Sequence, residues 1–174
     1  MHQNTNMKNF KLLIAFACAA LATLPSAQAG SHTWSGVNDI YFNNTSNWSY
    51  GGAPTNGEQN IYLYFPASAT RYNPSNNITG LTVNMISFSG DNYILSGKPI
   101  TLTGGTNLMS SGAGNSIALP LVMAGSNTAA SVTTGKLLVL AAPVSGASHL
   151  TKVGPGKLFL NPGSPNLYGG TICD

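Results

Sequence analysis

The sequence predicts an all-β fold: a parallel β-helix or solenoid that follows an N-terminal cap and a cleaved signal peptide. Only 6% of the residues are charged, and 20 glycines and 10 prolines interrupt the chain, which disfavours long helices. Hydrophobic residues make up 43% of the sequence, enough to build a core. Short apolar runs recur at intervals of about 20 residues with turn residues between them, as in stacked repeat proteins.

Residues 1–29 have the pattern of a secretory signal peptide. Lys8 and Lys11 supply positive charge, an apolar run occupies residues 12–24, and Ala27-Gln28-Ala29 forms an A-x-A cleavage site. A transmembrane anchor is the alternative, but a span needs about 20 apolar residues, more than this run provides. We therefore expect an exported protein, located outside the cell, on its surface or in the periplasm, with no transmembrane span after cleavage.

Signal cleavage changes the charge of the chain. The full sequence carries seven basic and four acidic residues, and two of the basic ones, Lys8 and Lys11, lie in the signal segment. The mature chain therefore keeps five basic residues against four acidic ones and has a net charge of +1 instead of +3. Its basic residues do not cluster with interleaved aromatic residues, so the sequence argues against a nucleic-acid partner.

Residues 30–60 are expected to cap the solenoid. They contain both tryptophans, Trp34 and Trp48, and the open apolar end of a strand stack needs an atypical unit to cover it. The alternative is a carbohydrate-binding or glycan-active protein, in which Trp34 and Trp48 stack on sugar rings together with Tyr62 and Tyr64.

Residues 61–174 are expected to form the solenoid repeats. The apolar positions Leu102, Leu121, Leu140 and Leu160 are separated by 19, 19 and 20 residues. This period predicts one strand-turn-strand coil per repeat, with neighbouring coils about 4.8 Å apart so that each buries the leucines of the next. An antiparallel sandwich is the alternative, because its short strands also recur with turns between them. Strand-like runs occur at residues 61–65, 78–83, 85–89, 93–95, 100–103, 117–123, 137–141 and 158–160, with a loop at 66–77.

The segment 150–172 (LTKVGPGKLFLNPGSPNLYGGTI) resembles the autotransporter-associated β-strand repeat of secreted bacterial passenger proteins. Residues 86–105 resemble a less regular unit of the same kind, and the tryptophan-containing segment is similar to the start of such proteins. The residues that carry the main resemblance are Leu150, Thr151, Lys152, Gly154, Gly156, Leu158, Leu160, Asn166, Tyr168, Gly169, Gly170 and Thr171.

This resemblance implies a secreted or surface-exposed structural module of passenger type, with a possible role in adhesion to a surface or glycan ligand. The last strand begins at residues 169–172, close to the end of the sequence, so we expect a short or truncated member whose repeats are incomplete at the C-terminus. A remnant without a function of its own is a further alternative. An open edge at the last coil predicts self-association, which size-exclusion chromatography can test.

No catalytic, cofactor-binding or metal-binding residues are expected. The acidic residues Asp39, Glu58 and Asp91 have the sequence context of turn or capping residues, and nothing places two of them together as a catalytic pair. His32 and His149 are far apart in sequence and lack further ligands at metal-site spacing. The sequence therefore predicts a protein that is not an enzyme.

Overall fold

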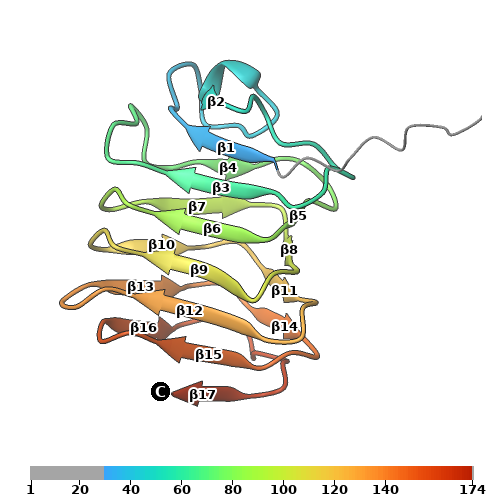
Figure 1. The fold of residues 1–174 in the computed structure, drawn as a ribbon, viewed down its shortest axis with the longest axis vertical. Helices are drawn as coiled ribbons and strands as arrows, with labels where there is room; N and C mark the ends of the chain where they lie inside the picture. The colour runs from blue at the N-terminus through green and yellow to red at the C-terminus, as the bar shows by residue number, and fades with distance from the viewer. Residues whose placement is uncertain (1–29, 174) are drawn as a thin grey trace, which may run out of the picture.

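The computed structural model describes residues 30–173, so the predicted signal peptide, with Ala27 and Ala29, lies outside the described residues. The described chain is almost entirely β, with one short 3-10 helix, η1 (Thr45–Asn47). Its strands wind into coils that stack along the long axis of the molecule, from the N-terminal segment with β1 (Ser31–Trp34) near one end to β17 (Thr171–Cys173) at the other (Figure 1). The predicted β-solenoid is confirmed.

Three sheets run along the stack. The first has eight strands, in the spatial order β17, β15 (Leu150–Val153), β12 (Thr128–Val132), β9 (Thr106–Ser110), β6 (Met85–Phe88), β3 (Tyr62–Phe65), β1 and β2 (Trp48–Tyr50). The second has five: β16 (Lys157–Leu160), β13 (Leu137–Leu140), β10 (Asn115–Ile117), β7 (Ile94–Gly97) and β4 (Ser75–Asn76). The third has four: β14 (Val144–Gly146), β11 (Leu121–Met123), β8 (Ile100–Leu102) and β5 (Thr82–Val83).

Each complete coil takes one strand from each sheet, for example β6, β7 and β8. Neighbouring coils pair in parallel, and the antiparallel pair of β1 with β2 occurs only in the N-terminal segment of the described chain. The predicted antiparallel alternative therefore does not apply to the stack.

The strand register corrects the repeat inferred from four leucines. Leu102 and Leu121 lie in the third sheet, whereas Leu140 and Leu160 lie in the second, so the four residues do not form one column. Leu140 does pair with Leu160, but the partner of Leu121 on the following coil is Val144 instead of Leu140. The inference was wrong because each coil contains three strands. The apolar run at Leu121 belongs to the third sheet and the run at Leu140 to the second, so they are not equivalent positions of successive coils.

Columns of apolar side chains fill the interior. Leu63, Ile86, Leu108 and Ala130 occupy matching positions on successive strands of the first sheet, and all four are buried. Residues alternate between the two faces of a strand, so stacking in register keeps each column on the inside. Burial of each large apolar side chain stabilises the fold by about 1.5–3 kcal/mol, which no isolated coil could obtain.

Glycine and asparagine make the corners of the coil. Gly97 ends β7 with φ +106°, and a β-carbon at this position would lie 2.3 Å from the carbonyl oxygen of Asn76 on the preceding coil. Inside another corner, the buried Asn115 amide donates to the Gly90 carbonyl at 3.0 Å and accepts from the Tyr93 N–H at 2.9 Å. These contacts satisfy backbone groups that the turn would otherwise bury unpaired.

Candidate functional site

Both tryptophans lie inside an aromatic cluster at the N-terminal end of the stack. Trp34 is fully buried and Trp48 is 6% exposed, and their ring centroids are 5.2 Å apart. The indole N–H of Trp34 donates to the Arg71 carbonyl at 2.8 Å, and that of Trp48 donates to the Phe42 carbonyl at 2.8 Å. Because neither ring presents a free face, the structure argues against the alternative in which Trp34 and Trp48 stack on sugar rings.

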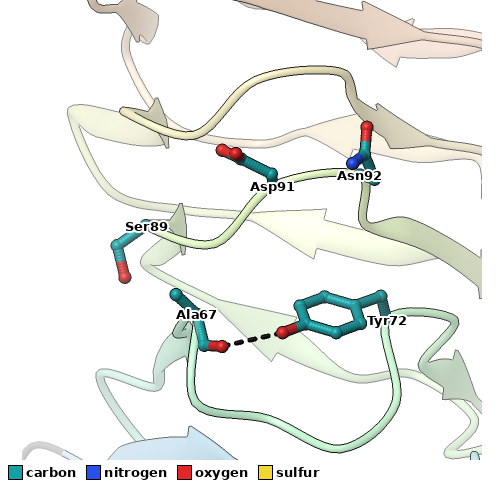
Figure 2. A pocket seen from close by; sticks show the side chains of 5 residues that line it. All are labelled: Ala67, Tyr72, Ser89, Asp91 and Asn92. Atoms are coloured by element: carbon teal, nitrogen blue, oxygen red, sulfur yellow. Dashed lines mark hydrogen bonds between the residues drawn. The ribbon is translucent and has the colours of Figure 1, made fainter.

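A hollow of about 370 Å³ lies on the corner between the first and second sheets. It is lined by Ala67 and Tyr72 from one coil and by Ser89, Asp91 and Asn92 from the next, and we call it the Tyr72 hollow (Figure 2). Two loops that belong to successive coils thus face each other across one coil spacing.

The aromatic wall of this hollow is held in place. The Tyr72 hydroxyl donates to the Ala67 carbonyl at 2.7 Å, and the Tyr72 ring packs on Tyr93 with centroids 4.8 Å apart. Tyr93 is buried behind it and donates to the Pro66 carbonyl at 2.7 Å. Burial raises the pKa of the Tyr93 hydroxyl, with a further contribution from Tyr72, so it stays a neutral donor.

The polar wall of the Tyr72 hollow is equally fixed. Asp91 Oδ1 accepts the Ala113 N–H at 2.6 Å, and the Asn92 N–H donates to the Ala113 carbonyl at 2.8 Å. Asn92 has φ +59°, in the left-handed region. The glycine at position 114 makes room for its amide, since a β-carbon there would stand 2.7 Å from Asn92 Oδ1.

A second hollow, also about 370 Å³, lies on the corner between the third and first sheets, and its lining among residues 30–173 includes no aromatic side chain. We call it the Asn60 hollow, after the lining residue Asn60, whose backbone has φ +55°. Asn84 donates to Asn60 Oδ1 at 3.3 Å and accepts from the Thr103 hydroxyl at 3.3 Å. Its lining residues are Asn56, Gly57, Glu58, Gln59, Asn60, Thr82, Asn84 and Thr103.

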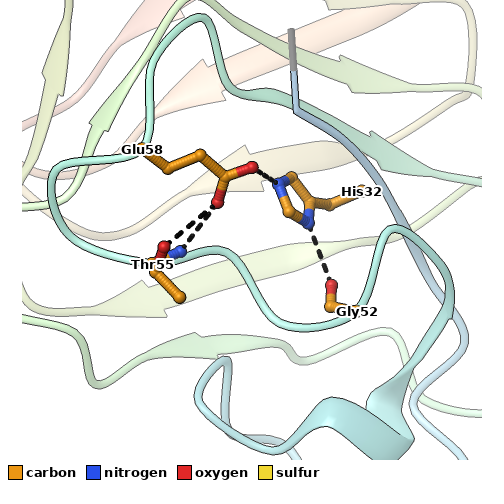
Figure 3. Close-up of polar contacts among 4 residues, drawn as sticks. All are labelled: His32, Gly52, Thr55 and Glu58. Atoms are coloured by element: carbon orange, nitrogen blue, oxygen red, sulfur yellow. Dashed lines mark hydrogen bonds and ion pairs between the residues drawn. The ribbon is translucent and has the colours of Figure 1, made fainter. Parts of the chain in front are cut away.

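His32 and Glu58 form a partly buried polar contact beside the Asn60 hollow (Figure 3). His32 is 2% exposed; its Nε2 lies 2.9 Å from Glu58 Oε1 and its Nδ1 lies 2.9 Å from the Gly52 carbonyl. The other carboxylate oxygen accepts the N–H of Thr55 at 3.1 Å and its hydroxyl at 3.3 Å. The histidine therefore ties the loop between β2 and β3 onto β1.

Asp39 organises the loop that follows β1. Its carboxylate accepts the Tyr41 N–H at 2.7 Å and the side-chain amides of Asn44 at 2.8 Å, Asn47 at 2.5 Å and Asn38 at 3.3 Å. The Tyr41 N–H is the main reason why the pKa of Asp39 lies below its usual value; the three amides lower it further and desolvation opposes them.

Within the described part of the chain, the acidic side chains lie in separate loops. Asp39, Glu58 and Asp91 each accept backbone N–H groups in separate loops, as the sequence predicts for turn acids. Within residues 30–173, no group of three or more His, Cys, Asp or Glu side chains is placed to hold a metal ion.

The motif residues of segment 150–172 contact the preceding coil. Gly154 has φ +77°, and a β-carbon on Gly156 would lie 2.2 Å from the Thr133 carbonyl oxygen. Asn166 Oδ1 accepts the Val144 N–H at 2.9 Å. Leu158, Leu160 and Tyr168 pack against the core, Gly169 donates to the Ser148 carbonyl, and the Gly170 carbonyl accepts from Leu150.

Two motif residues have polar contacts of their own. The Tyr168 and Thr171 hydroxyls are 2.6 Å apart. Lys152 pairs in register with the buried Ala130, so it continues an interior column, and its ammonium group donates to the carbonyls of Val153 and Gly154.

No protein-family model, curated protein or solved structure matches this chain. Among the described residues, none of the helical structure has the length and apolar character needed to cross a membrane.

Proposed function

We propose that this protein is an exported structural β-solenoid of the autotransporter passenger type, acting at the cell surface without catalysis. The observation that carries the proposal is the role of the repeat-like motif. Residues such as Gly156 and Asn166 contact the preceding coil, and the side chains that resemble the family signature hold one coil on another. Such a motif serves a scaffold that presents loops and edges to its surroundings.

Residues 30–60 act as the cap of this scaffold. Strand β1 pairs with β3, and the aromatic side chains of Trp34, Phe42 and Trp48 pack on Phe65 of the first coil. This arrangement supports a cap because it covers the apolar end that stacked coils otherwise expose.

Export is tested by expressing the full chain with a C-terminal tag in a Gram-negative host. The intact mass of the recovered protein should correspond to a chain that begins at Gly30. A variant carrying Ala27→Asp and Ala29→Asp should remain uncleaved, whereas Gln28→Ser, between the two alanines, should be processed normally. Recovery of the wild-type chain in the cytoplasm with residues 1–29 intact would contradict the proposal.

The scaffold role is tested with Gly156→Ala. Its β-carbon would meet the Thr133 carbonyl, so we expect a lower unfolding midpoint and faster proteolysis of the C-terminal coils. Gly163→Ala is the matched control, because no atom lies within 4 Å of the added β-carbon. If Gly156→Ala abolished binding to host cells or to a purified ligand while stability stayed unchanged, the motif would be a recognition element instead.

A further inference from the structure

We propose that His32 is a proton-dependent clasp for the loop between β2 and β3. The clasp is closed when both ring nitrogens carry a proton, and it opens on one side when one of these protons is lost. This role goes beyond that of a scaffold, and it does not depend on export of the protein.

Both ring nitrogens of His32 face oxygen atoms that accept hydrogen bonds (Figure 3). Nδ1 lies 2.9 Å from the Gly52 carbonyl oxygen, and Nε2 lies 2.9 Å from Glu58 Oε1. Glu58 Oε2 accepts both the N–H and the hydroxyl of Thr55, which is the bonding expected of a carboxylate. A neutral imidazole has a single N–H and can donate to one of the two oxygens, whereas an imidazolium donates to both. The geometry therefore corresponds to an imidazolium paired with a carboxylate.

The ring has little room to turn away and little water to replace a lost partner. His32 is 2% exposed, and the ring of Trp48 packs edge-on against it with centroids 5.9 Å apart. A β-carbon on Gly30 would lie 2.9 Å from Nε2, and one on Gly51 would lie 3.2 Å from Nδ1, so the backbone passes close to both nitrogens. A nitrogen lone pair that faces an oxygen here stays unpaired, which is costly in a buried place.

The surroundings supply one charge to balance the imidazolium. Strand β1 has no other titratable side chain, and β3 places the apolar Leu63 in register with His32. Strand β2 contributes the ring of Trp48. Among the described residues, Glu58 is the charged partner in contact with His32. A buried charge is stable while it is paired, so the second proton of His32 depends on the contact with Glu58.

Loss of one proton opens one side of the clasp. We expect the neutral imidazole to keep its N–H on Nε2, because a hydrogen bond to a carboxylate is about twice as strong as one to a carbonyl. The lone pair of Nδ1 then faces the Gly52 carbonyl oxygen, and the start of the loop is released. Residues 56–60 of the same loop line the Asn60 hollow, so the proton also affects the shape of that hollow.

The test is hydrogen–deuterium exchange of the full chain at about pH 5.5 and about pH 8.5, on either side of the pH at which an unperturbed histidine titrates. Each rate is corrected for the intrinsic pH dependence of amide exchange. Protection of the amides in residues 51–61 should be about tenfold lower at the higher pH, the effect of one lost hydrogen bond. Equal protection of this loop at the two pH values would overturn the proposal.

Glu58→Gln separates the proton from the contact. The glutamine amide can donate to Nε2 of a neutral imidazole while its oxygen keeps the Thr55 N–H, so both loop contacts form without the second proton. Loop protection in this variant should therefore be the same at both pH values. His149→Gln is the matched control, because it removes an exposed histidine and should leave the pH dependence of the wild type intact.

Two results with these variants would contradict the clasp: a pH dependence like that of the wild type in Glu58→Gln, or its loss in His149→Gln. If Glu58→Gln unfolds, nitrogen-15 spectra of the labelled His32 ring in the wild type decide. Two slowly exchanging N–H groups are expected at about pH 5.5, and one, on Nε2, at about pH 8.5. A single N–H at the lower pH, or a remaining proton on Nδ1 at the higher pH, would rule the clasp out.

Discussion

Replacement of Phe65 by alanine should strongly destabilise the N-terminal end of the solenoid. Phe65 is fully buried, with Phe88 at a centroid distance of 5.1 Å on one side and Phe42 at 6.2 Å on the other, both nearly parallel to it. Tyr93, at 5.4 Å, also meets it. A buried Phe→Ala change costs about 3–5 kcal/mol, a large part of the roughly 5–15 kcal/mol that usually holds a domain together.

Urea unfolding provides the measurement. With a denaturant slope of about 2 kcal/mol per molar, the expected loss lowers the midpoint by about 2 M. Phe65→Leu keeps most of the volume and loses the aromatic contacts, so it should cost about 1–2 kcal/mol. Phe159→Ala, at a position 55% exposed on β16, is the control and should change the stability by no more than about 0.5 kcal/mol.

Two probes show where the loss occurs. Both tryptophans of the chain lie near Phe65, so their fluorescence reports the N-terminal end, while far-ultraviolet circular dichroism reports all the coils. We expect the fluorescence transition of Phe65→Ala to move at least as far as the dichroism transition. A shift below about 0.5 M in both signals would refute the argument that this cluster joins the N-terminal segment to the first coil.

Three further predictions follow from the loops and corners. Gly97→Ala should lose at least about 1–2 kcal/mol from its φ of +106° alone, whereas Gly105→Ala, with nothing within 4 Å of the new β-carbon, should have a nearly unchanged melting temperature. The lowered pKa of Asp39 contributes stability that is present above its unfolded value of 3.8 and is lost as pH falls through the folded value. The urea midpoint of Asp39→Asn should therefore lie below that of the wild type near neutral pH, and the difference should shrink in more acidic solution; a constant difference would contradict the assignment. Glu58→Ala leaves the buried His32 without its carboxylate partner and should lower the free energy of unfolding by about 1–3 kcal/mol, measured by thermal unfolding. An unchanged melting temperature would show that the contact between His32 and Glu58 does not stabilise the loop between β2 and β3.

The sequence predicts the fold class and the strands with clear apolar alternation. Strands β3, β6, β13 and β16 all coincide with or overlap predicted runs. Strand β12 was missed because its inward positions are Thr128, Ala130 and Val132, of which only the last is a large apolar residue. Its pairing with β9 and β15, a tertiary property, identifies it as a strand.

The candidate site was less predictable. Tyr72 and Asn92 become neighbours only because each coil returns to the same corner as the one before it, and without the register their spacing in the sequence has no meaning. The pairing of His32 with Glu58 likewise joins residues of two separate segments. The acidic residues, by contrast, were predictable as turn residues, since Asp39 and Asp91 lie in short polar stretches and accept backbone N–H groups there.

The regular winding of the first sheet has an evolutionary consequence. The interval in sequence from Ile86 to Leu108 is the same as the interval from Leu108 to Ala130. The strand β9 pairs in parallel with the preceding coil through one edge and with the following coil through the other. An in-frame tandem duplication of one such interval would therefore lengthen the molecule by one layer without disturbing the coils on either side. Insertions of other lengths would instead emerge as loops at the corners, where new surface chemistry can arise while the stack beneath is preserved.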